Sequence, residues 1–336
     1  MESKYKSALI NIVDRIGIRW PGESGRRFGI TSILFHSFFG PDETLTAGRE
    51  RLRRFCEWIH NNYTPLTAAE YIEAALSNAV VDNGIFVTFD DAKKRLLDCI
   101  DIFLEFDIPI TIFAVCGWLD SDQIDNETIA LARIVAALEH YHGPAQSLQT
   151  HGNDMLLLGS KCSEIEIEKI LDRFDANSAF SVDLWKEIQQ VPFITSLGAS
   201  ICSWGDLKSI ASDKIAIGSH SISHCRMAGK STRRIQYEIN ASKKLIDENV
   251  GCCDLFAYPY GTWDVVNADT TKLLTCSDYK CGFLVSAGYG SDNNRYTLPR
   301  ADIPDSIIDD STFQSLVRGG QIPLIMAKNF LTSRNA

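Results

Sequence analysis

The stretch Gly84-Ile85-Phe86-Val87-Thr88-Phe89-Asp90-Asp91 decides the fold of this chain. After the glycine, β-branched and aromatic residues follow one another without a polar break larger than a threonine, which is the pattern of a buried strand in a parallel sheet. Asp90 and Asp91 then stand at the carboxyl end of that strand, where α/β proteins gather their functional side chains. Two adjacent ionised carboxylates repel each other, so we expect a cation or an arginine beside them.

A second apolar run, Lys214-Ile215-Ala216-Ile217-Gly218, leads into Ser219-His220-Ser221-Ile222-Ser223-His224. The spacing predicts that His220 and His224 lie on one face of a helical turn. Two imidazoles and one carboxylate, with a position left open for water, are the usual ligands of a catalytic rather than a structural metal. Each motif alone is common at strand ends and on surfaces, whereas the two together favour a functional site.

Three segments of the chain resemble, in order, the signatures of the polysaccharide deacetylases, carbohydrate esterase family 4. They are Val87-Thr88-Phe89-Asp90-Asp91, Ile217-Gly218-Ser219-His220-Ser221-Ile222-Ser223-His224 and Phe256-Ala257-Tyr258-Pro259-Tyr260-Gly261. The likeness covers most of residues 29–303, with a gap between about 120 and 199. It implies a distorted (β/α) barrel that removes acetyl groups from N-acetylated sugars.

The resemblance also implies a role for each polar residue of these segments. Asp91, His220 and His224 would hold one divalent metal ion, and Asp90 would be the general base that takes a proton from metal-bound water. The metal would lower the pKa of that water and polarise the amide carbonyl. The backbone N–H of Tyr260 matches the family's second oxyanion donor. The ligand set suits zinc first, with cobalt, nickel or manganese as alternatives.

Two departures from the family pattern concern the carboxylate end of the site. Ala92 stands where a glycine usually follows the Asp-Asp pair, which affects the loop backbone over the metal. The arginine that often precedes Pro-Tyr is absent. We predict that Arg300, at the tip of a strand formed by Leu298-Pro299-Arg300, presents its guanidinium to Asp90; the alternative is a surface arginine.

The third departure concerns the general acid, because no histidine follows His224. His36 ends the apolar run of residues 30–35, which predicts the first barrel strand, and it should point into the same mouth. An imidazole can protonate a leaving amine near neutral pH, so His36 is the candidate acid, with a core or loop histidine as the alternative. Trp263 is the candidate platform for a sugar face, with a core aromatic as the alternative.

The remaining patterns predict one large α/β domain with an insertion. Amphipathic helices are expected at 43–61, from a capping box at Thr67 and Glu70, and at 92–106, 129–138, 163–174 and 233–248. The predicted parts are an N-terminal extension over 1–28, a barrel of about seven parallel strands over 29–310, and a C-terminal helix and tail over 311–336. The helical insertion at about 120–199 either shapes a substrate cleft or mediates dimer contacts.

Composition excludes several classes of protein. The 43 acidic and 33 basic residues give a net charge of −10, and no basic stripe with interleaved aromatics occurs, which argues against a nucleic-acid partner. No segment is apolar enough to cross a bilayer, and the first residues lack a secretory pattern, so we expect a cytoplasmic enzyme. The 10 cysteines fit a reducing compartment, and a homo-oligomer is compatible with the sequence.

These patterns together predict a hydrolase of carbon–nitrogen bonds other than peptide bonds. Its substrate would be an N-acetylated polysaccharide, oligosaccharide or glycan precursor. Two alternatives stay open: a non-catalytic carbohydrate-binding or scaffold relative, and a deacylase of a small N-acylated metabolite or nucleotide sugar. The presence of Asp90 favours an enzyme, because a site that only binds metal needs Asp91 and the histidines but no neighbouring base.

Overall fold

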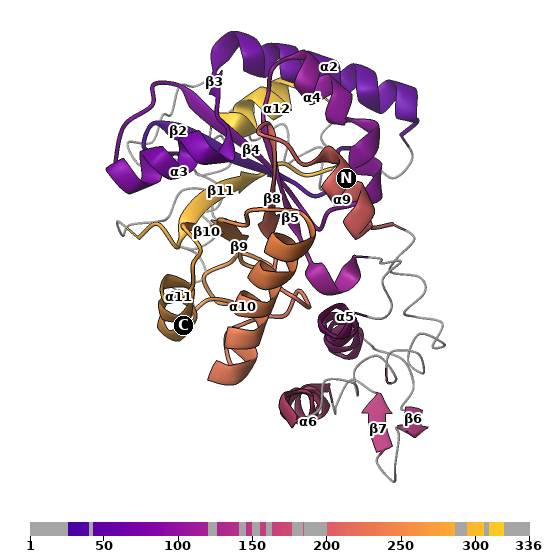
Figure 1. The fold of residues 1–336 in the computed structure, drawn as a ribbon. Helices are drawn as coiled ribbons and strands as arrows, with labels where there is room; N and C mark the ends of the chain where they lie inside the picture. Colours follow the sequence, from indigo (N-terminus) through magenta and orange to yellow (C-terminus); the bar gives the residue numbers. More distant parts are fainter. Residues whose placement is uncertain are drawn as a thin grey trace, which may run out of the picture.

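Among the described residues, seven parallel strands form a closed barrel in the computed structural model of this chain. Around the ring they follow the order β2-β11-β10-β9-β8-β5-β4, and β4 pairs with β2 to close it. Their bounds are β2 (Ile30–Phe35), β4 (Gly84–Asp90), β5 (Ile110–Ala114), β8 (Ile215–Ser219), β9 (Leu255–Ala257), β10 (Cys281–Val285) and β11 (Leu298–Asp302). The structure describes residues 26–39, 43–119, 126–140, 146–149, 155–158, 163–176, 184, 200–285, 294–305 and 309–318. The predicted distorted (β/α) barrel is thereby confirmed (Figure 1).

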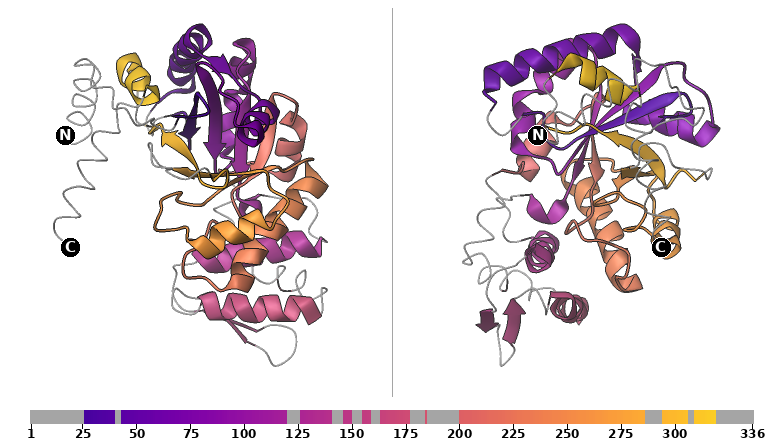
Figure 2. Two further views of the ribbon diagram at one scale, coloured as in Figure 1. Left: turned by 90° about the vertical axis from the view of Figure 1, so that its left-hand side faces the viewer. Right: turned by 180° about the vertical axis from the view of Figure 1, so that it is seen from behind.

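Two shorter strands extend the sheet beyond the ring. β1 (Arg26–Arg27) pairs antiparallel with β2, and β3 (Thr64–Pro65) pairs parallel with β4. A separate antiparallel pair, β6 (Gln146–Gln149) and β7 (Met155–Leu158), belongs to the predicted insertion and lies apart from the barrel (Figures 1 and 2). The insertion therefore has a small sheet of its own.

An aromatic cluster fills the barrel below the carboxyl end of β4. Phe283 on β10 meets Phe86 on β4 and Phe113 on β5, with ring centroids 5.7 and 5.6 Å away. Tyr71 of helix α3 (Ala68–Ser77) packs against Phe86 at 4.4 Å. Because successive side chains of a strand alternate between its two faces, Asp90 lies on the same face of β4 as Phe86. The polar end of this strand face thus rests on a packed aromatic layer.

Helices surround the barrel and follow most of the predicted spans. Besides α3, they are α2 (Leu45–Asn62), α4 (Ile100–Glu105), α9 (Trp204–Ile210), α10 (Thr232–Asn249), α11 (Ala268–Thr275) and α12 (Asp310–Val317). The capping box between Thr67 and Glu70 is present at the start of α3. The helices expected at 43–61 and 233–248 are confirmed as α2 and α10.

The helix predicted over residues 92–106 is wrong in its first half. A 3₁₀ helix, η1 (Lys94–Asp98), takes that place, and α4 begins only at Ile100. The carbonyl of Ala92 accepts a hydrogen bond from the Cys202 N–H at 2.9 Å, and the Lys94 N–H donates to the Ser200 carbonyl at 2.8 Å. The first of these long-range bonds occupies the Ala92 carbonyl, which a continuous α-helix would use as its first acceptor, and both hold the segment against residues 200–202.

Two helices of the insertion pack beside the barrel. α5 (Glu127–His140) contacts the 3₁₀ helix η2 (Cys116–Trp118) and α10, and α6 (Ser163–Ala176) packs on α5. Both helices predicted in this region are confirmed. The predicted tail after residue 318 lies outside the described residues, and the limits of the three predicted parts of the chain stay predictions.

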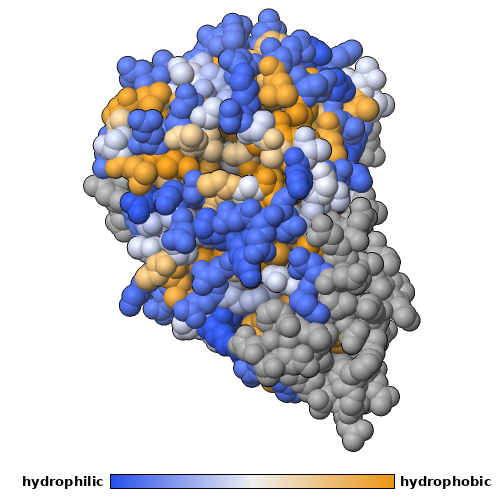
Figure 3. All heavy atoms as spheres, viewed as in Figure 1, coloured by the Kyte–Doolittle hydropathy of each residue, from blue (hydrophilic) through white to orange (hydrophobic). Residues whose placement is uncertain are grey.

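The surface is mixed in character. On the face shown in Figure 3, hydrophilic residues cover the top and the centre of the coloured surface, and hydrophobic residues form a band between them. Tyr260 and Trp263 are among the exposed large hydrophobic side chains. In the part of the chain that the structure describes, no helix combines the length and the apolar character needed to span a membrane.

Candidate metal centre

The chain turns sharply where β4 ends, and this turn separates the two adjacent carboxylates. Asp91 and Ala92 have φ angles of 70° and 53°, in the left-handed region that favours glycine. Ala92 therefore keeps a glycine-like backbone at a conformational cost of roughly 1 kcal/mol. Asp90 is left 2% exposed at the end of the strand, and Asp91 faces the histidine-bearing loop across the barrel mouth.

Asp91, His220 and His224 meet in one cluster, in which one ligand atom from each lies within 4.8 Å of the others. Asp91 Oδ1 is 4.0 Å from His220 Nε2 and 3.8 Å from His224 Nε2. This oxygen is buried and has no hydrogen-bond partner among the described residues, which is the state expected of an atom that binds a cation. The three residues therefore fit a divalent metal ion.

The tautomer of His220 also suits a ligand. Its Nδ1–H donates a hydrogen bond of 2.8 Å to the carbonyl of Ala257. Because a neutral imidazole carries only one proton, Nε2 then presents a lone pair to the cluster. A backbone carbonyl in this position fixes both the tautomer and the ring orientation of a metal-binding histidine.

The prediction that the two histidines share a helical turn is wrong. The segment between them is a loop in which Ser221 and His224 have φ angles of 70° and 54°. Its N–H groups at Ile222 and Ser223 both donate to the carboxylate of Glu238, at 2.8 and 2.9 Å, instead of to helical carbonyls. The imidazoles still converge, with ring centroids 4.9 Å apart.

His224 is neutral over the ordinary pH range. Its burial, with smaller contributions from His220 and His140, lowers the pKa of this imidazole from 6.5 to about 2. A metal ligand must be unprotonated, so this environment leaves His224 ready to bind a cation at neutral pH without first losing a proton.

Asp90 is held by Arg300. The guanidinium donates hydrogen bonds of 2.7 and 2.9 Å to the two carboxylate oxygens, and a further one of 3.0 Å to Thr88 Oγ1. Arg300 is fully buried, 5.0 Å from the centre of the Phe113 ring. The predicted contact is present, and the alternative of a surface arginine is wrong.

Two opposing effects act on the pKa of Asp90. Burial raises it, but the nearby Arg300 charge, with help from His220, outweighs burial and lowers the pKa below its ordinary value of 3.8. Asp90 is therefore an ionised carboxylate at neutral pH, and its Oδ2 lies 3.6 Å from His220 Nε2.

His36 follows β2 directly and is not a core histidine, since its side chain is 42% exposed. Its Nδ1 lies 3.7 Å from Asp302 Oδ1. We did not predict Asp302, although it could have been found, because it stands two residues after Arg300 and so lies on the same face of β11.

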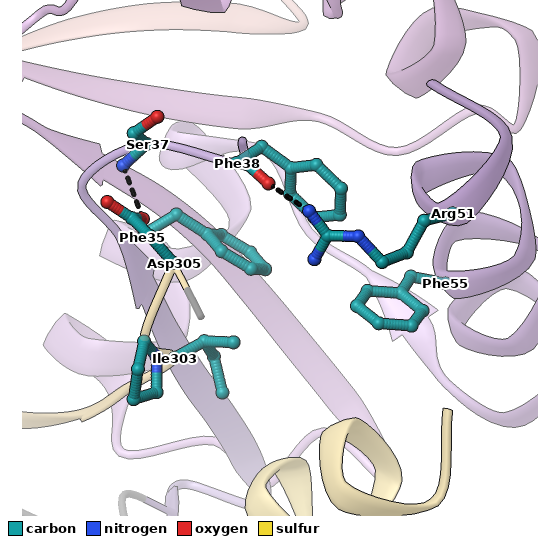
Figure 4. A pocket seen from close by; sticks show the side chains of 8 residues that line it. Phe35, Ser37, Phe38, Arg51, Phe55, Ile303 and Asp305 are labelled. Atoms are coloured by element: carbon teal, nitrogen blue, oxygen red, sulfur yellow. Dashed lines mark hydrogen bonds between the residues drawn. The ribbon is translucent and has the colours of Figure 1, made fainter. Parts of the chain in front are cut away.

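The segment after His36 is fixed beside a small cavity (Figure 4). The Ser37 N–H donates to Asp305 Oδ1 at 2.8 Å. Arg51 donates to the Phe38 carbonyl at 2.6 Å, and its guanidinium lies 4.5 Å from the centre of the Phe38 ring. These contacts, made by residues far apart in the sequence, hold the chain in place as it leaves β2.

Tyr260 and Gly261 form a tight turn next to the histidines, with φ angles of 62° and 61°. A side chain at Gly261 would bring its Cβ to 2.5 Å from the Val285 nitrogen, so only glycine fits there. The Tyr260 ring centroid is 4.7 Å from that of His224. Within the described residues, nothing accepts a hydrogen bond from the Tyr260 backbone N–H. Trp263 is 46% exposed, so the alternative of a core aromatic is wrong, and its role as a sugar platform stays a prediction.

Two further residues near the cluster were not predicted from the sequence. The Trp118 ring centroid lies 5.1 Å from that of His224, and Lys93 Nζ lies 3.8 Å from Asp91 Oδ2. Trp118 follows β5 closely, so the rule that functional residues gather at strand ends could have indicated it. Lys93 could have been found as the nearest cation to the paired carboxylates.

Comparison with known proteins agrees with this geometry. The family model described as polysaccharide deacetylase matches residues 77–278. This chain belongs to the polysaccharide deacetylase family. The resemblance inferred from the three motifs is thereby confirmed, and the hydrolysis of amide-linked acetyl groups on sugars is the chemistry associated with this family.

Solved structures support the fold. IcaB from Ammonifex degensii is 12% identical, with a TM-score of 0.53 over 87% of this chain and 97% of that one. A putative polysaccharide deacetylase from Bacillus anthracis is 13% identical, with a TM-score of 0.51 over 85% and 68%. A polysaccharide deacetylase from Bacillus cereus is 12% identical, with a TM-score of 0.51 over 88% and 69%. No curated protein matches the chain.

Proposed function

We propose that this family member is a metal-dependent hydrolase that removes the N-acetyl group from an N-acetylated sugar. One observation carries the proposal: the unpartnered Asp91 Oδ1 faces two imidazole nitrogens, and the ionised Asp90 lies 3.6 Å from one of them. A ligand cluster beside a separate carboxylate base is the minimum that hydrolysis by an activated water requires.

Asp91, His220 and His224 would hold the ion. When bound, a divalent metal would polarise the acetyl carbonyl and make water a stronger nucleophile near neutral pH. We propose zinc first, with cobalt, nickel or manganese as alternatives, because two imidazoles and one carboxylate accept all four ions.

The protein's own groups would move the protons. Asp90 is ionised and fixed by two hydrogen bonds from Arg300, so it can accept a proton from the attacking water. The backbone N–H of Tyr260, which has no acceptor within the described ranges, would donate to the oxyanion that develops on the substrate. His36, with its ring next to Asp302, would protonate the leaving amine.

The substrate we propose is an N-acetylated polysaccharide, oligosaccharide or glycan precursor. Exposed aromatic rings support a sugar, since the flat apolar face of a pyranose packs well on an aromatic face. Tyr260 lies in the turn next to His224 and is 47% exposed, and Trp263, two residues after Gly261, is 46% exposed. We further propose a cytoplasmic location, which the many buried cysteine thiols favour.

The alternative of a binding module that lost its activity is less favoured. The guanidinium of Arg300 fixes the carboxylate of Asp90, which nevertheless lies 3.6 Å from the ligand His220, where a general base is needed. A site that only binds metal has no use for Asp90, which is not part of the ligand cluster.

The decisive experiment measures acetate release from N-acetylated mono- and oligosaccharides and nucleotide sugars. We expect chelation to abolish release by the wild type, and Asp90→Asn to reduce it by about 10²- to 10⁴-fold while metal binding persists. Asp107→Asn is the matched control, because Asp107 is an exposed carboxylate paired with Lys214. A metal-loaded wild type that binds sugar yet releases no acetate would favour the binding module instead.

A further inference from the structure

The loop between the two histidine ligands is supported by the insertion. The carbonyl of Ser223, the residue directly before His224, lies 2.6 Å from His140 Nε2. A carbonyl can only accept, so His140 Nε2 carries a proton and donates it. His140 is the last residue of α5, the first helix of the insertion.

The same loop is held from its other side by α10. Glu238 accepts the N–H groups of Ile222 and Ser223, and Arg234 donates to Glu238 Oε1 at 2.9 Å and to Ser223 Oγ at 2.8 Å. The two N–H groups of Ile222 and Ser223 therefore face α10, and the carbonyl of Ser223 faces α5. Because hydrogen bonds fix the backbone of Ser223 from both α10 and α5, its peptide groups have little freedom to rotate.

The end of α5 is itself anchored. Glu139, next to His140, lies 3.3 Å from both Arg234 Nη2 and Lys230 Nζ. The His140 ring packs edge-on against Trp118 at 5.4 Å, and Trp118 in turn contacts the His224 ring. His140 is thus a fixed donor on a fixed helix end.

We propose that His140 is a positioning residue for the metal ligand His224, so that the insertion completes the metal centre. This inference rests on the proposed function. The need for support follows from the backbone: His224 holds a φ of 54°, a conformation that a non-glycine residue keeps only when its surroundings enforce it. The role differs from both earlier interpretations of the insertion, as a cleft wall or as a dimer contact.

Two substitutions separate the donor from the ring. His140→Phe keeps an aromatic ring against Trp118 but removes the N–H, whereas His140→Gln loses the ring but places an amide N–H near the position of Nε2. In the full-length protein, we expect His140→Phe to raise the Co²⁺ dissociation constant by about 10-fold or more. We also expect it to change the visible absorption spectrum of the bound cobalt, and we expect His140→Gln to restore both towards wild type.

His60→Phe is the matched control. His60 also bonds a backbone carbonyl, that of Phe106 at 2.9 Å, and also packs on an aromatic ring, but it lies on α2. Its substitution should leave Co²⁺ binding unchanged. Thermal unfolding of the metal-free variants reports any general loss of structure, and if His140→Phe does not fold, His140→Met against His140→Gln makes the same comparison.

The outcomes distinguish this inference from the proposed function. Equal Co²⁺ affinity and spectrum in wild type and His140→Phe, in a wild type that releases acetate, would overturn the inference alone. The expected series in a wild type that releases no acetate would support the inference and contradict the proposed function. A wild type that binds no Co²⁺ would overturn both.

Discussion

Two buried guanidinium–carboxylate pairs stand within the same site and are used in opposite ways. Arg300 and Asp90 meet inside the barrel mouth, and Arg234 and Glu238 meet beneath the histidine loop. Asp90 is held by the guanidinium and still faces His220. Glu238 instead binds two loop N–H groups and the Ser223 hydroxyl besides its arginine.

The difference shows how surroundings assign a role to the same chemical pair. In the barrel mouth, Arg300 is the one residue in the described part of the chain that donates hydrogen bonds to the carboxylate, and a negative charge remains directed at the cluster. Under the loop, the negative charge is spread over backbone donors, so it fixes a conformation and is not available for proton transfer. Variants that break each pair should therefore differ in kind as well as in size.

The largest effect is expected from Arg300→Met. It leaves the buried Asp90 charge without its partner, which should lower the free energy of unfolding by about 3 to 5 kcal/mol and abolish acetate release. Urea unfolding at neutral pH measures the first quantity. Arg54→Met is the matched control, because Arg54 and Asp310 form a pair of the same chemistry that is about half exposed, and its loss should cost about 0 to 1 kcal/mol. Equal losses in the two variants would show that burial does not set the strength of the Arg300 pair.

Glu238→Gln should have a smaller effect on stability and a clearer one on the metal. One side-chain oxygen remains to accept from the loop, and Glu139 still lies 3.3 Å from Arg234, so the loss should be about 1 to 3 kcal/mol. Because the loop carries His224, we expect Co²⁺ affinity to fall about 10-fold. Titration with cobalt measures this, and an unchanged affinity would mean that Glu238 serves the fold alone.

The stability of the metal-free protein in acid should reflect two overlapping contributions, one that begins to act below about pH 6.5 and a second that is added below about pH 3.8. Below about pH 6.5, His224 takes up a proton in the unfolded chain but stays neutral in the folded protein, because folding lowers its pKa to about 2. The free energy of unfolding therefore decreases as the pH falls below about 6.5. The lowered pKa of Asp90 contributes stability above its ordinary value of 3.8, and this is lost at lower pH. Each slope should reach at most about 1.4 kcal/mol per pH unit.

In unfolding experiments between pH 3 and 8, His224→Asn should reduce the loss of stability that begins near pH 6.5. Asp90→Asn should reduce the additional loss below about pH 3.8. The measurement sharpens the comparison because it isolates the carboxylate of the barrel mouth from the rest of the site. If stability still begins to fall near pH 6.5 in His224→Asn, the proton taken up on unfolding belongs to another group.

Strand ends could be predicted from the sequence, and loop shapes could not. Asp90 and Arg300 could be predicted because short, nearly continuous apolar runs mark buried strands and so also mark where those strands end. His140 and Glu238 were missed because their partner Ser223 lies 83 and 15 positions away in the chain, and no local pattern encodes such a contact. The spacing of His220 and His224 is shared by helical turns and by loops, so it could not predict the backbone between them.

Barrel closure has a consequence for how such chains are recognised. β2 lies between β11 and β4 in the ring, so the first strand ends at the same rim as the last one. The strands follow one another around the ring in chain order, and closure makes the first and the last of them neighbours. Residues from opposite ends of the chain therefore reach the same rim, and a search that expects a site residue near one end of the chain would overlook an equivalent position near the other.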